Sequence, residues 1–149
     1  MKRKTVITAH FVASIIAGIT IVTFFSLSLL AEIKGDIQFI KNVKAFILYA
    51  LPVMVIAMPM LKITGDKLAG KSINAIILVK KKRMKLMIVN GIGLMTLAVF
   101  LYFRSHFHEI DHVFFIAQIA EFGFGLGNLT LIVLNARSGL QLSGKLKRK

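Results

Sequence analysis

Four long apolar runs alternate with shorter, charge-rich segments, and this alternation dominates the sequence. The runs cover residues 5–31, 45–61, 84–103 and 113–134. An α-helix rises about 1.5 Å per residue and the bilayer hydrocarbon is about 30 Å thick, so about 20 apolar residues can span it. The second run is the shortest and contains Pro52 and Pro59, which membrane helices tolerate. We therefore expect an all-α integral membrane four-helix bundle, a single domain over residues 1–149.

The composition supports a membrane protein. The chain has 149 residues, of which 56% are hydrophobic, and a soluble domain of this size is less apolar. The basic tail Lys2–Lys4 resembles the start of a signal peptide, but the run after it is far longer than the usual 7–15 residues. We expect it to stay as the first span. There is no cysteine, so disulfides and thiolate metal sites are excluded.

The formal net charge of +14 is concentrated in three segments. These are the N-terminal tail, the connection between the second and third runs, and the C-terminal tail. With four spans all three lie on one side, so the positive-inside rule predicts both termini in the cytoplasm and a multi-pass protein of the bacterial inner membrane. Anionic headgroups are the expected partner, and no nucleic acid is needed to explain the charge. The basic residues of these three segments are Lys2, Arg3, Lys4, Lys62, Lys67, Lys71, Lys80, Lys81, Lys82, Arg83, Lys85, Arg137, Lys145, Lys147, Arg148 and Lys149.

Residues Gly65–Ser72 match the phosphate-binding pattern GxxxxGK[ST]. That pattern binds nucleotides when a strand leads into it and a helix follows, so that backbone N–H groups surround the phosphates. Here a membrane span precedes the pattern, and no apolar strand ending in an aspartate follows it. We interpret this segment as a turn with solvated lysines.

Residues His108–His112 match HExxH, the zinc-binding pattern of metalloproteases. On a helix the two histidines would lie one turn apart, Glu109 would act as the base, and His106 is a candidate third ligand. The group would lie at the outer end of the fourth span, with no domain around it. We favour a solvated polar cap in which the helix dipole attracts the acids, and keep His106, His108 and His112 as an alternative metal group.

The fourth run carries one polar stripe. Gln118, Glu121, Gly125 and Asn128 fall within a sector of roughly 80°, so they share the face that we expect to point into the bundle. A charge in the membrane costs about 2.5–3.5 kcal/mol on insertion scales. Because no Lys or Arg lies deep in any predicted span, we expect Glu121 to be neutral or hydrogen-bonded, to Gln118 or to Thr96.

A second polar level is predicted nearer the cytoplasm. His10, Asn90 and Asn128 each lie about 8–10 Å from the cytoplasmic end of their spans. They either bond one another, at about 0.6 kcal/mol per bond, or line a site. We favour mutual bonding. Gly123 and Gly127 form a GxxxG spacing on another face of the fourth span and predict a close helix contact there.

Two family resemblances add expectations. The stretch His10-Phe11-Val12-Ala13-Ser14 resembles the four-span haem-binding protoporphyrinogen oxidases of bacterial membranes, which implies haem b with His10 as a ligand. The chain also resembles a family of small four-span inner-membrane proteins of uncharacterised activity, which implies fold and location only. The residues behind that second resemblance are Lys82, Arg83, Met84, Asn90, Gly91, Gln118, Glu121, Asn128 and 134–140.

Three functions are compatible with these features. The one we favour is a non-catalytic accessory or scaffold subunit held by helix–helix packing and intramembrane polar contacts, alone or with other membrane subunits or copies of itself. One alternative is a b-type haem or quinone-associated redox protein that uses His10. The other is a small proton-coupled transporter that uses Glu121. We expect no catalytic residues.

Overall fold

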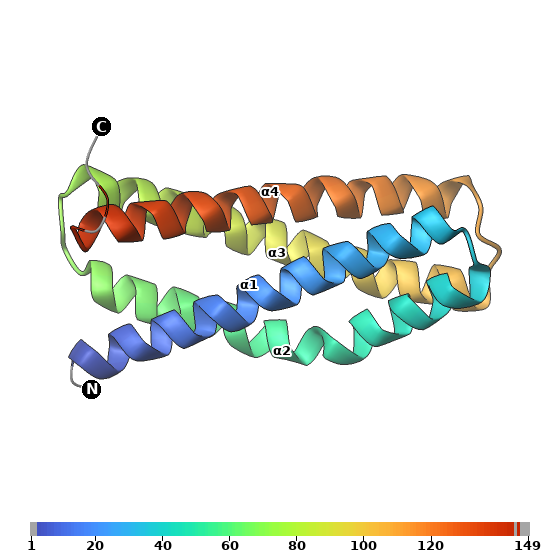
Figure 1. Ribbon diagram of the computed structural model, residues 1–149, viewed down its shortest axis with the longest axis horizontal. Helices are drawn as coiled ribbons and strands as arrows, with labels where there is room; N and C mark the ends of the chain where they lie inside the picture. The colour runs from blue at the N-terminus through green and yellow to red at the C-terminus, as the bar shows by residue number, and fades with distance from the viewer. Residues whose placement is uncertain (1–2, 145, 147–149) are drawn as a thin grey trace.

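Four long helices make up the described part of the chain, residues 3–144 and 146 of a computed structural model. They are α1 (Arg3–Lys34), α2 (Ile37–Ala69), α3 (Ala75–Phe107) and α4 (His112–Leu142), and each is long and apolar enough to cross a membrane. The helices run lengthwise in one bundle, with both chain ends at the same end (Figure 1). The predicted all-α class is confirmed for these residues.

The helices extend well beyond the apolar runs because polar side chains cap their ends. The carboxylate of Asp36 accepts from Phe39 N at 2.7 Å at the start of α2, and the Asn74 side chain accepts from Ile76 N at 2.9 Å at the start of α3. The turn before Asp36 uses Gly35 at φ +62°, a left-handed conformation that suits glycine. As a result residues 37–44, which we had placed in a connection, form the first two turns of α2.

The same extension changes the phosphate-binding pattern. The first five residues of Gly65–Ser72 belong to α2, which ends at Ala69 with Gly70 as its cap. No strand leads into the pattern within the described residues, so the backbone geometry of a phosphate-binding loop is absent. The expectation of a turn over the whole segment was wrong, because helix α2 continues through its first five residues.

The helices pack in a cycle. The most extensive contacts join α1 to α2 and α3 to α4, followed by α2 to α3, and the seam between α1 and α4 is the least extensive. The diagonal helices α2 and α4 do not approach within 8 Å between Cα atoms anywhere in the described chain. Any direct link between them must therefore be made by long side chains.

The interior is small and mostly apolar. Two buried clusters fill it, and both use alanine where helices approach closely. Large apolar side chains such as Ile56 (68% exposed) and Ile119 (70% exposed) cover the outside, as expected of a lipid-facing surface. The clusters contain Ala31, Ile40, Val43, Ile47, Ala98, Leu101, Phe114 and Ala117, and Ala17, Ile21, Met54 and Ala57.

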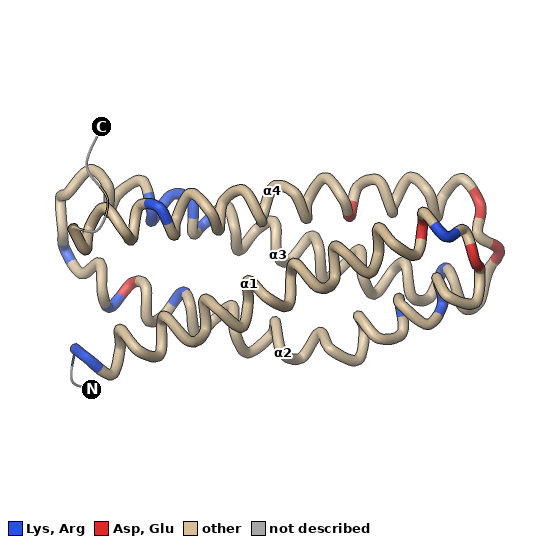
Figure 2. Tube along the Cα trace, viewed as in Figure 1, with Lys and Arg blue, Asp and Glu red and all other residues tan. Residues whose placement is uncertain are grey.

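The charges separate along the bundle axis (Figure 2). We call the end with both termini and the 70–74 connection the basic end; Asp66 is its only acid within the described residues. The other end, with the connections at 35–36 and 108–111, is called the far end and carries both signs of charge. Lys2, Lys145, Lys147, Arg148 and Lys149 lie outside the described residues.

Candidate functional site

A buried ion pair joins the two diagonal helices. Lys44 of α2 is 0% exposed, and its Nζ lies 2.8 Å from Oε2 of Glu121 on α4. The same ammonium group donates to Ser28 Oγ of α1 at 3.1 Å. Three helices therefore meet at one ammonium group, about two turns inside the far end of α2.

Glu121 has the partner that the sequence predicted and another that it did not. Gln118 Nε2 donates to Glu121 Oε2 at 2.7 Å, which confirms the expected bond. Thr96 instead donates to Ile92 O of its own helix at 3.0 Å. The expectation that no cation reaches Glu121 was wrong, because Lys44 lies inside α2 and not in the connection before it. A buried carboxylate with a bonded ammonium need not be neutral.

A second carboxylate stands beside this pair. Glu32 lies one turn beyond Ser28, the α1 residue that accepts a hydrogen bond from Lys44, and so lies on the same side of α1. Its Oε1 atom is buried and has no hydrogen-bond partner among the described residues. We call Glu32, Lys44 and Glu121 the charge cluster. It combines two carboxylates with one ammonium group.

A small cavity adjoins the charge cluster at the centre of the bundle. It measures about 50 Å³ and is lined mainly by apolar side chains from all four helices. Its polar walls are Ser28, Glu121 and Asn128. Asn128 is 1% exposed, and its Oδ1 has no partner among the described residues. A water molecule in a space of this size would need polar partners of this kind.

The predicted layer of His10, Asn90 and Asn128 does not form. His10 Nδ1 lies 2.9 Å from Thr64 Oγ1 on α2, and Asn90 Nδ2 donates to the backbone oxygen of Phe124 at 3.1 Å. Similar depth along separate helices was not sufficient, because these side chains point toward different neighbours. Asn128 faces the cavity instead.

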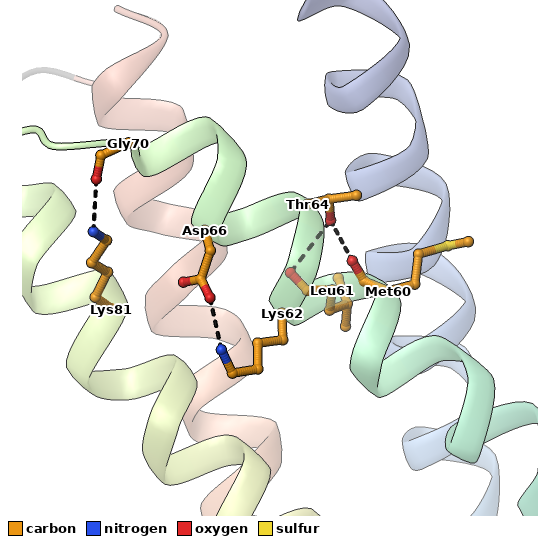
Figure 3. A network of polar contacts seen from close by, with 7 residues as sticks. All are labelled: Met60, Leu61, Lys62, Thr64, Asp66, Gly70 and Lys81. Carbon is orange, nitrogen blue, oxygen red and sulfur yellow. Dashed lines mark hydrogen bonds and ion pairs between the residues drawn. The ribbon is translucent and has the colours of Figure 1, made fainter. Parts of the chain in front are cut away.

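The bond between His10 and Thr64 also shows that Nδ1 of the His10 ring carries a hydrogen. Thr64 Oγ1 donates its own hydrogen to the backbone oxygen of Met60 at 2.6 Å, as Figure 3 shows. It can therefore only accept from His10, so Nδ1 of His10 carries a hydrogen and donates it to Thr64. This bond links α1 to α2 near the basic end.

The role of His10 as a haem ligand stays a prediction. One side of its ring is closely packed, because a Cβ atom at Gly65 would lie 2.9 Å from Met84 Cε and 3.5 Å from His10 Cε1. The central cavity is about 50 Å³ and does not include His10. Pockets for organic ligands are usually about 300–1,000 Å³.

The three histidines of the far end do not form a metal site. No group of three or more His, Cys, Asp or Glu residues in the described chain is placed to hold a metal ion. The reason is that HExxH requires one continuous helix, whereas α3 ends at Phe107 with His108 as its cap and α4 begins at His112. His106 Nδ1 lies 2.9 Å from the Tyr102 oxygen of its own helix. The polar-cap interpretation agrees with Asp111, which accepts from Phe114 N at 3.2 Å.

Exposed cations of the basic end make polar contacts within α2 and with its last residues. Figure 3 shows Lys62 paired with Asp66 at 2.7 Å and Lys81 donating to the Gly70 oxygen at 2.9 Å. An open groove of about 400 Å³ lies nearby, between the start of α1 and the end of α2. Its lining is Arg3, Val6, Lys67 and Leu68.

The two glycines of the GxxxG spacing have different surroundings. A Cβ atom at Gly127 would lie 2.9 Å from Asn90 Nδ2, so this glycine lets α3 approach α4. A Cβ atom at Gly123 would meet nothing within 4 Å. The predicted close helix contact is therefore made at Gly127, between α3 and α4, and not at Gly123.

Lys44, Ser28 and Glu32 were not predicted as members of the site. One signal was available: Asp36 is a good helix cap, and Ile40, Val43 and Ile47 follow it at helical spacing. Comparisons with known proteins add nothing to this geometry, since no family model, curated protein or solved structure matches the chain. The function must be argued from the site itself.

Proposed function

We propose that this chain is a multi-pass protein of the bacterial inner membrane and acts there as a non-catalytic accessory or scaffold subunit. The observation that carries the proposal is the filled interior. The central cavity measures about 50 Å³, well below the 300 Å³ or more of common ligand pockets. The buried ammonium of Lys44 bonds to side chains of its own chain, on α1 and α4. A bundle closed in this way offers other subunits its outer surface.

The proposed orientation places both termini in the cytoplasm. Its support is the crowding of cations at the basic end, where Asp66 is the only described acid (Figure 2). Anionic lipid headgroups are the proposed partner of this end. The groove lined by Arg3, Val6, Lys67 and Leu68 offers two cations for a phosphate and two apolar side chains for the start of an acyl chain.

Cysteine crosslinking in native membranes tests the accessory role. The chain has no cysteine, so each introduced cysteine is unique. Cysteines would replace exposed residues on each helix in turn: Ile19, Ile56, Val89 and Ile119. We expect at least one position to give a discrete heavier adduct of constant size. Ala13→Cys, at a site 1% exposed, is the matched control and should give none. A chain that forms no adduct from any helix would contradict the proposal.

A proton-coupled carrier is the second candidate, and the place of Glu121 beside both Lys44 and the cavity favours it. Its test is proton release on substrate addition in reconstituted vesicles, which Glu121→Gln should abolish. An absorption spectrum separates either function from the haem alternative. A Soret band that disappears in His10→Ala would contradict the accessory proposal.

A further inference from the structure

The charge cluster is one positive charge short. Glu121 and Lys44 form a buried pair, and the half-buried Glu32 adds a second carboxylate whose Oε1 atom is enclosed without a hydrogen-bond partner among the described residues. An excess charge that is partly removed from water is costly unless it is neutralised. We propose that the charge cluster binds one small monovalent cation, a proton or Na⁺, between α1 and α4. The inference does not depend on the accessory role.

Unpartnered oxygens supply an independent observation. Gln118 is 2% exposed, and its Oε1 has no hydrogen-bond partner among the described residues. Its Nε2 bonds Glu121 Oε2 at 2.7 Å, which holds the whole amide group against the cluster. The buried side-chain atoms without a partner in the described chain are all oxygens, on Glu32, Gln118, Asn128 and Asn135. Of these, Glu32 and Gln118 belong to the charge cluster or bond to it, and what their free oxygens lack is a donor or a cation.

The charge of Lys44 is already counted in the cluster, and its ammonium group does not bond the free oxygen of Glu32. An ammonium group has three N–H bonds, and Lys44 uses two of them for Ser28 and Glu121. Glu32 Oε1 is not among its partners. From the other helices, α1 contributes Glu32 and α4 contributes Glu121. The nearest charged group of α3 toward the far end, Arg104, is engaged by Asp111.

The donor set defines the ligand. Carboxylate, amide and hydroxyl oxygens are hard donors, which favour H⁺ or Na⁺ over soft metals. The net charge of the cluster calls for a single positive charge. Glu32 is only half-buried, so the cluster is reached from the far end, and on the inner side Glu121 borders the central cavity.

The test uses purified full-length protein in lipid nanodiscs. One arm measures thermal unfolding against Na⁺ concentration at fixed pH, with choline to keep the ionic strength constant. A ligand that binds only the folded protein raises its stability in a saturable manner. The other arm uses infrared spectroscopy to detect a protonated buried carboxyl group at fixed Na⁺. We expect one arm to respond: a Na⁺-dependent shift identifies sodium, and a protonated carboxyl band identifies the proton.

Three substitutions test whether the response comes from the charge cluster. Glu32→Gln removes the excess charge and should abolish it, whereas Glu109→Gln, the same change at an exposed acid of the far end, should leave it intact. Gln118→Met keeps both carboxylates and should weaken the affinity by about tenfold or more, as loss of supporting ligands does in metal sites. A wild-type protein with neither response overturns the proposal, as does an unchanged response in both Glu32→Gln and Gln118→Met.

Discussion

The ammonium group of Lys44 balances one of the two carboxylates in the charge cluster, so its removal should lower the stability of the fold strongly. Lys44→Met leaves Glu121 buried without its cation, and breaking a buried pair from one side typically costs about 3–5 kcal/mol. Glu121→Gln should cost a similar amount. We expect the double variant to recover much of the loss, because two neutral side chains need no compensation. Unfolding in detergent would show this, and additive losses would contradict the pairing.

A second pair, at the far end, gives stability a pH dependence. The hydrogen bond from Arg104 holds the pKa of Asp111 below its usual value. A carboxylate of this kind stabilises the fold above its unfolded pKa of about 3.9 and loses that contribution as the pH falls through the lower folded value. Asp111→Asn keeps a good helix cap but removes the charge. We expect thermal unfolding curves of this variant to fall below wild type at neutral pH and to approach it in acid.

At the scale of the helix, the contact between α3 and α4 depends on Gly127. An added methyl group would lie 2.9 Å from Asn90 Nδ2 and force that side chain away from the Phe124 oxygen. We expect Gly127→Ala to lower the unfolding free energy by about 1–3 kcal/mol, a usual cost of overpacking. Gly123→Ala, one turn earlier with nothing within 4 Å, is the control. Equal stability of the two variants would show that the close approach is unimportant.

The existence of the helices could be predicted from sequence, but their ends could not. Long apolar runs are typical of helices that can span a bilayer, so hydropathy locates these helices. The first turns of α2 are polar and are held by the Asp36 cap, which hydropathy does not register. That difference of two turns moved Lys44 from a connection into the bundle. Gln118 and Glu121 were found because they share one helix, whereas the partner of Glu121 lies 77 residues away.

At the scale of the whole molecule, the separation of charge predicts that the basic end of the bundle faces the cytoplasm. Single cysteines at Glu109, in the far-end connection, and at exposed Ile73, in the basic-end connection, would report it. We expect a membrane-impermeant thiol reagent to label Glu109→Cys on intact cells with the outer membrane removed. Ile73→Cys should react only after permeabilisation. The reverse pattern would place the termini outside the cell.

The bond between diagonal helices also constrains how the protein is made. A ribosome completes Lys44 77 residues before it reaches Glu121, so the ammonium group has no partner on α4 while α2 is being made. The pair can close only after α4 has arrived, when the least extensive seam, between α1 and α4, also closes. Closing the last seam therefore buries the ammonium group of Lys44 and the carboxylate of Glu121 together.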